Sequence, residues 1–246
     1  MILGFIACVC LLCAPFLLLP TILAFKNRKR ARHVLLALNV SWFAVAALIS
    51  HGALTVLIAL ILWLVLLHFA IQQDVPHLAD LDEDVELLNY DPAWPDIFAV
   101  ERARIANALD VAVDDIEHIG STAVPGLTAK PVIDMMLGVK ALPPRGELSR
   151  LGILGYQNCG AAGVPGRIYL RLRGEQAINL HIVERGGAHW TNNLALRELL
   201  QRDAAAREKY SAGKRAALAQ AGGRLLAYSA AKNALVTELL AAARQR

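Results

Sequence analysis

The sequence predicts an α+β protein in which a mixed sheet is flanked by helices and followed by a helical tail, with a transmembrane helical region in front. Three observations support this prediction. The first 71 residues contain no Asp or Glu, although the chain has 21 acidic residues. Residues 131–139 form a nearly continuous apolar run, which is typical of a buried strand. Residues 188–244 are rich in Ala, Leu, Glu, Lys and Arg, which are strong helix formers.

The N-terminal 71 residues are predicted to be a transmembrane anchor. Residues 1–25 are uncharged and exceed the roughly 20 apolar residues that cross a bilayer. A cleaved signal peptide is the alternative, but no basic residue precedes this run. The next apolar stretch is interrupted at residues 50–52, which predicts two further helices at 34–49 and 53–71. A re-entrant or tilted hairpin is the alternative for this pair.

Five Lys or Arg residues lie within residues 26–32 and should remain on the cytoplasmic side. Three crossings then place the soluble domain in the cytoplasm, and two would place it outside. The prediction is a multi-pass protein of a bacterial-type inner membrane, with the lipid bilayer as partner. Residues 72–84 are an acidic linker, either a regulatory tether or a solvated spacer.

The predicted soluble domain spans residues 85–246. Subtracting the five basic residues from the chain's 25 leaves 20 against 21 acidic residues after residue 71, so residues 72–246 carry about −1 and give no electrostatic case for nucleic-acid binding. Its predicted strands are 85–90, 114–119, 131–139, 167–173 and 177–183. Its predicted helices are 93–109, 143–154, 188–202, 203–221 and 224–244.

A glycine–serine turn and a buried carboxylate are the features that point to chemistry. Gly120 allows close approach of a ligand to the backbone, and Ser121 and Thr122 offer hydroxyl and N–H groups that suit an anion. Asp134 stands in an apolar strand, where a carboxylate is costly unless it is paired or binds a metal. The alternative is that Ser121 and Thr122 are helix caps and that Asp134 pairs with a Lys or Arg.

Residues 117–134, EHIGSTAVPGLTAKPVID, resemble the signature of the GrpB family at nearly every position. The stretch VELLNYDPAWP at 85–95, the strand LHIVE at 180–184 and the tail pairs Tyr210–Lys214 and Tyr228–Lys232 also resemble this family, which covers about residues 85–242. Residues 15–70 resemble the small superinfection-immunity membrane family through the stretch LPTILAF, a basic loop and LALN.

The GrpB resemblance implies a nucleotidyltransferase-like fold that binds a nucleoside triphosphate with Mg²⁺ and transfers a nucleotidyl group to an unknown acceptor. Asp134 would bind the metal, with His181 in place of a later carboxylate and Glu117 as a further candidate ligand. Met136 occupies the position of the second carboxylate. The implied catalytic residues are Asp134, Ser121, His181 and His118. The implied phosphate-binding residues are Gly120, Ser121, Thr122, Lys130, Arg171 and Arg173, with Arg197 as a further candidate.

Two other functions remain open. The methionine at position 136 favours a non-catalytic domain that senses a nucleotide or phosphorylated metabolite and reports to the membrane segment. The second resemblance favours a membrane immunity or interaction module in which the N-terminal region is the active part.

Overall fold

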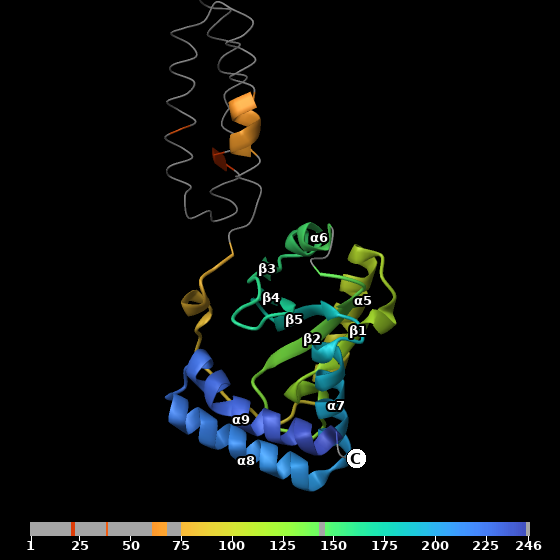
Figure 1. Cartoon of the computed structure of the whole chain (residues 1–246), viewed down its shortest axis with the longest axis vertical. Helices are drawn as coiled ribbons and strands as arrows, with labels where there is room; N and C mark the ends of the chain where they lie inside the picture. Colours follow the sequence, from red (N-terminus) through yellow and green to blue (C-terminus); the bar gives the residue numbers. More distant parts are fainter. Residues whose placement is uncertain (1–20, 23–37, 39–60, 68–74, 143–145, 245–246) are drawn as a thin grey trace, which may run out of the picture. The chain divides into compact units, whose positions relative to one another are not determined.

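The computed structural model describes residues 21–22, 38, 61–67, 75–142 and 146–244. The chain divides into two compact units, Met1–Asp74 and Val75–Arg246. The second unit contains the sheet and the long helices, and it is the part described below (Figure 1).

The second unit is built on a five-stranded mixed sheet with the strand order β1-β2-β5-β4-β3. The strands are β1 Ile116–Ile119, β2 Val132–Val139, β3 Gln157–Asn158, β4 Arg167–Leu172 and β5 Ala177–Glu184. Strands β2 and β5 pair in parallel, and the other neighbours are antiparallel. Because β2 is covered on both faces, nearly all of its residues are apolar, as expected for a central strand.

Helices cover both faces of the sheet. They are α5 Trp94–Leu109, α6 Glu147–Ile153, α7 Ala188–Arg202, α8 Ala204–Ala221 and α9 Leu225–Arg244. Pro95 opens α5, and Asp110 ends it in a left-handed conformation. Asp203 caps α8 by accepting a hydrogen bond from the backbone N–H of Ala206 at 2.9 Å.

Successive side chains of β2 point to opposite faces of the sheet, so they pack in two different cores. Ile133, Met135 and Leu137 pack with α5 and α6 in the larger core. Met136 faces the other side and packs against Trp190 of α7. Asp134 shares the Met136 face, and helices α8 and α9 run past this side of the sheet as an antiparallel pair (Figure 1).

The mixed sheet and its flanking helices agree with the fold predicted from the sequence, but two local elements differ. The strand predicted at 85–90 reduces to one isolated bridge, which joins Leu88 to Ala129, because its partner is a loop residue and not a sheet edge. The strand predicted from residue 114 begins at Ile116, because Val113–Asp115 forms a 3-10 turn.

The transmembrane region requires a correction. The spans predicted at 1–25, 34–49 and 53–71 lie almost entirely outside the described residues. Within the described ranges, no helix combines the length and hydropathy needed to cross a bilayer. On that finding the prediction of a transmembrane helical region is wrong, and so is the prediction of a multi-pass inner-membrane protein.

Residues 75–86, which we call the strap, include most of the predicted acidic linker and lie against the domain. A 3-10 turn at Leu78–Leu81 buries Leu81. Arg173 holds Glu83 through two hydrogen bonds of 2.9 and 3.1 Å. Arg224 donates to Asp82 and to Asp84. Asp82, Glu83 and Asp84 therefore pair with arginines of the sheet and the helical tail.

Candidate functional site

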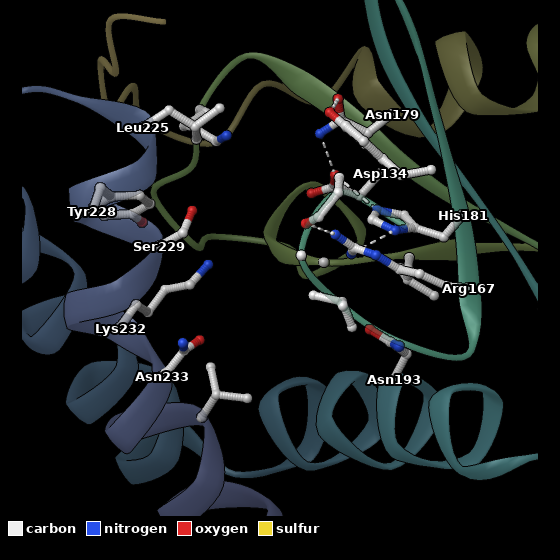
Figure 2. A pocket seen from close by; sticks show the side chains of 18 of the residues that line it. Asp134, Arg167, Asn179, His181, Asn193, Leu225, Tyr228, Ser229, Lys232 and Asn233 are labelled. Atoms are coloured by element: carbon white, nitrogen blue, oxygen red, sulfur yellow. Dashed lines mark hydrogen bonds and ion pairs between the residues drawn. The ribbon is translucent and has the colours of Figure 1, made fainter. Parts of the chain in front are cut away.

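A cavity of about 520 Å³ lies between the Asp134 face of the sheet and α9. Figure 2 shows Asp134, His181 and Arg167 on one side of it, and Tyr228, Ser229, Lys232 and Asn233 of α9 on the other. The charged residues in its lining are Asp134, Lys130, Arg167, Arg197 and Lys232. One carboxylate therefore faces the cavity with four cationic side chains.

Asp134 lies directly beside the glycine–serine turn because β1 and β2 pair in the register that places Ile119 opposite Asp134. A Cβ built on Gly120 would lie 2.6 Å from Asp134 Oδ2, so only glycine leaves room for the carboxylate. The φ of Gly120 is +71°, which also favours glycine. The turn and the carboxylate thus form one compact unit.

The Asp134 carboxylate is held ionised. Burial raises its pKa, but the N–H groups of His181 and Asn179 and the positive charge of Lys130 together outweigh burial and keep the pKa well below its ordinary value. The Asn179 amide donates to Asp134 Oδ1 at 2.7 Å. The side chain remains 27% exposed and lines the cavity.

The proton position on His181 follows from its neighbour Arg167. Arg167 Nη1 lies 3.1 Å from His181 Nδ1, and a guanidinium can only donate, so Nδ1 must accept. The proton of the neutral ring is therefore on Nε2, which lies 3.8 Å from Asp134 Oδ1. Burial lowers the pKa of His181, Asp134 opposes this shift, and Arg167 adds to it. The ring is therefore a neutral donor beside Asp134.

Asn179 connects Asp134 to the strap. Its Oδ1 accepts from Tyr169 at 2.7 Å and from Arg173 at 3.0 Å. Since arginine cannot accept, the amide orientation is fixed and its NH₂ group must face Asp134. Arg173 in turn holds Glu83, so a continuous series of hydrogen bonds runs from the strap to the carboxylate.

The serine of the turn contacts a buried lysine. Lys214 of α8 is 1% exposed, its Nζ lies 3.1 Å from Ser121 Oγ, and it donates to the carbonyl of Thr128. Burial lowers the pKa of Lys214 to about 7, and the nearby charge of Lys232 adds to this shift. Ser121 begins a 3-10 turn of only three residues, so no helix N-terminus of useful length stands behind it.

Several residues predicted for the site lie elsewhere or have other partners. His118 is one position from Ile119 and so faces the opposite side of the sheet, where it stacks on Phe98 at 4.6 Å and contacts Thr122 at 3.0 Å. Burial lowers the pKa of His118 to about 4. Glu117 shares the Asp134 face but accepts from Arg197 at 2.8 Å.

The two arginines predicted to bind phosphate contact the strap. Arg171 donates to the backbone carbonyls of Asp80 and Leu81. Arg173 holds Glu83 and Asn179. Neither arginine lines the cavity, and only Arg173 is connected to Asp134, through Asn179.

Four residues around the site were not predicted from the sequence: Arg167, Lys214, Lys232 and Asn179. A signal for the two lysines was present, because Tyr210–Lys214 and Tyr228–Lys232 repeat the same four-residue spacing on successive helices. In the structure each ammonium group lies over its tyrosine ring, at 5.0 and 5.2 Å from the ring centre. Both lysines face the turn from the helical tail.

The donor set suits one hard cation at most. Magnesium is commonly bound by one or two carboxylates together with phosphate oxygens and water. Asp134 can supply such a carboxylate, but the position of a second one is the fully buried Met136, which packs with Ile119, Val183 and Trp190. Within the described ranges, no group of three or more His, Cys, Asp or Glu residues could hold a metal by itself.

Comparison with known proteins gives consistent matches. A family model described as GrpB protein matches residues 84–242. A UPF0157 protein of Streptomyces coelicolor is 35% identical over 154 residues, which are 62% of this chain and 81% of that protein. The glutamate-rich protein GrpB of Alkalihalophilus pseudofirmus is 26% identical over 54% of this chain and 80% of its own length. A crystal structure of the conserved protein GrpB from Enterococcus faecalis superposes with a TM-score of 0.56 at 27% identity, covering 64% of this chain and 96% of that one.

Proposed function

Because the chain belongs to the GrpB family, whose model covers residues 84–242, we propose that the cavity beside Asp134 is a binding site for the phosphate groups of a nucleotide. The observation that carries this proposal is the charge of the cavity wall. Lys130, Arg167 and Lys232 face it together with one carboxylate. Cationic side chains that converge on a partly buried space favour a ligand with several negative charges.

The size and the apolar part of the cavity support a ligand larger than inorganic phosphate. Its volume of about 520 Å³ is within the range of small-molecule sites. Leu78 and Leu81 of the strap and Leu225 and Leu226 at the start of α9 line one side of it. A nucleoside could bury its base against these apolar groups while its phosphates face the lysines.

One Mg²⁺ ion completes the proposed site. Asp134 would hold it from the protein side, and the ligand's phosphate oxygens would supply most of the other donors. The ion would neutralise phosphate charge, while Lys130 and Lys232 hold the same phosphates and Asn179 holds the carboxylate in place. A pair of metal ions does not fit, because Met136 cannot supply the second carboxylate.

Transfer of a nucleotidyl group to an acceptor is a second candidate function. It is favoured by the lowered pKa of Asp134, whose carboxylate can orient an acceptor hydroxyl, and by the nucleotidyltransferase-like fold that the family resemblance implies. The membrane tether predicted from the sequence is not part of either proposal, because no described helix is long and apolar enough to cross a bilayer.

Isothermal titration of the full chain with each common nucleoside triphosphate, in the presence of Mg²⁺, tests the binding proposal. We expect binding that Lys232→Met weakens by about 10-fold or more, since a charge-assisted contact contributes about 1.5–3 kcal/mol. Lys140→Met is the matched control, because Lys140 is exposed and does not line the cavity. Absence of binding to every nucleotide would refute the proposal. Release of pyrophosphate in the presence of candidate acceptors would separate transfer from binding alone.

A further inference from the structure

A small side chamber of about 30 Å³ opens beside the main cavity. Its lining includes Ser121 and Thr122 of the turn and three lysines, Lys130, Lys214 and Lys232. Lys130, Asp134, Tyr228 and Lys232 line both spaces, so the chamber and the main cavity meet at these residues.

The convergence of three ammonium groups on so small a space requires an explanation. Among the ion pairs of residues 75–142 and 146–244, none involves Lys130, Lys214 or Lys232. Lys214 is almost completely buried, and a buried ammonium group without a carboxylate partner is costly. An anion in the chamber would remove that cost.

The hydrogen-bonding groups of the chamber suit an oxyanion. Lys214 already contacts Ser121 and Thr128, which fixes its amino group at the chamber wall. The hydroxyl of Ser121 can turn to donate to a ligand oxygen. The chamber volume corresponds to about two or three oxygen-sized atoms, so it admits two or three oxygens of a phosphate group and excludes a sugar or a base.

We propose that this chamber binds the terminal phosphate of the nucleotide, and that Lys214 takes up a proton when the phosphate enters. The inference rests on the proposed function and narrows it to a class of ligand, because only a di- or triphosphate can occupy the chamber and the main cavity at once. In the free protein, the Lys214 side chain is neutral in a fraction of the molecules. In the complex it is protonated in all of them.

Proton uptake follows from the surroundings of Lys214. Burial, together with the charges of Lys232 and Arg215, holds its pKa at about 7, while Asp134 acts in the opposite direction. A phosphate group in the chamber adds negative charge within contact distance and therefore raises the pKa. The groups that face this lysine are Tyr210 and Arg215 on its own helix, Lys232 and Tyr228 on α9, Asp134 on β2, and Lys130 after the turn.

The test is calorimetry of the full chain at pH 8 in two buffers that differ in ionisation enthalpy. Nucleoside mono-, di- and triphosphates and inorganic tripolyphosphate serve as ligands. At this pH the ligand phosphates are already ionised, so any proton taken up comes to the protein. We expect the triphosphate to bind more tightly than the monophosphate, with uptake approaching one proton. The affinity should decrease by up to about 10-fold per pH unit above pH 7.

Variants assign the uptake to one side chain. Lys214→Met should weaken binding of the triphosphate by about 10-fold or more and abolish proton uptake. Lys214→Arg keeps the charge at every pH, so it should bind without uptake even if its packing lowers the affinity. Lys140→Met is the control for loss of a distant exposed lysine. Circular dichroism of each variant confirms that it is folded.

The outcomes separate this inference from the proposed function. Equal affinity for mono- and triphosphate, or binding without proton uptake, refutes the proposal that the chamber binds the terminal phosphate. The proposed function is unaffected by either result. If no nucleotide binds but tripolyphosphate binds with uptake that Lys214→Arg removes, the proposed function fails and the anion subsite stands. If neither class of ligand binds, both are refuted.

Discussion

Substitution of Gly120 by alanine should damage both the stability of the domain and the position of its carboxylate. Gly120 has φ +71° and ψ −165°, a region that is essentially reserved for glycine, and a non-glycine residue there costs about 1–3 kcal/mol. The new Cβ would also lie 2.6 Å from Asp134 Oδ2 and 3.0 Å from Asp134 Cβ. The aspartate must therefore move.

Moving Asp134 breaks its 2.7 Å hydrogen bond from Asn179. A hydrogen bond to a charged group contributes about 1.5–3 kcal/mol, so we expect Gly120→Ala to lower the free energy of unfolding by about 2.5–6 kcal/mol in all. Gly126→Ala is the matched control. Gly126 has φ +79° in the same loop, but nothing lies within 4 Å of its added Cβ. Gly126→Ala should lower the free energy of unfolding by only about 1–2 kcal/mol.

Urea unfolding of the full chain, followed by circular dichroism, measures both variants. The same pair should differ in ligand binding, because only Gly120→Ala displaces the carboxylate. If Gly120→Ala is no more destabilising than Gly126→Ala, the close approach of the turn to Asp134 does not contribute as described, and the geometry of the proposed site is refuted.

Three further predictions concern the surroundings of the site. Tyr156→Phe removes a buried 2.6 Å hydrogen bond to Glu101 and should destabilise the domain by about 1–2 kcal/mol in urea unfolding, whereas an unchanged midpoint would contradict this. Glu83→Gln weakens the contact with Arg173 and should raise the rate of limited proteolysis within the strap, and equal cleavage rates would count against its docking. Because the pKa of His118 is about 4 in the folded state, below the unfolded value, stability should fall by about 2–3 kcal/mol as pH decreases from 6.5 to 4, and His118→Gln should lose this dependence.

The strands and helices that carry the fold were predictable because their signals are local. The apolar run at 131–139 became β2, and the Ala-rich segments became α8 and α9 within one or two residues. The strap was not predictable in the same way. Its acidic composition is typical of a solvated segment, and only the folded domain brings Arg173 and Arg224 to it.

The site was predictable only in part. The sequence placed Gly120, Ser121 and Asp134 within one motif, and the structure brings Gly120 and Asp134 into contact. The side of the sheet on which His118 lies depends on the register between β1 and β2, which no local pattern specifies. Lys214 reaches Ser121 across 93 residues of sequence, so its role depends on how the helical tail packs.

The parallel pairing of β2 with β5 has a consequence for synthesis of the chain. Asp134 meets Asn179 across 45 residues, and Lys232 of the cavity wall lies near the C-terminus. While the ribosome is still making α9, the emerging polypeptide can form the β1–β2 hairpin but cannot yet enclose a ligand. We therefore expect a ligand of the cavity to stabilise the domain only once α9 has been made, since long-range contacts of this kind form late.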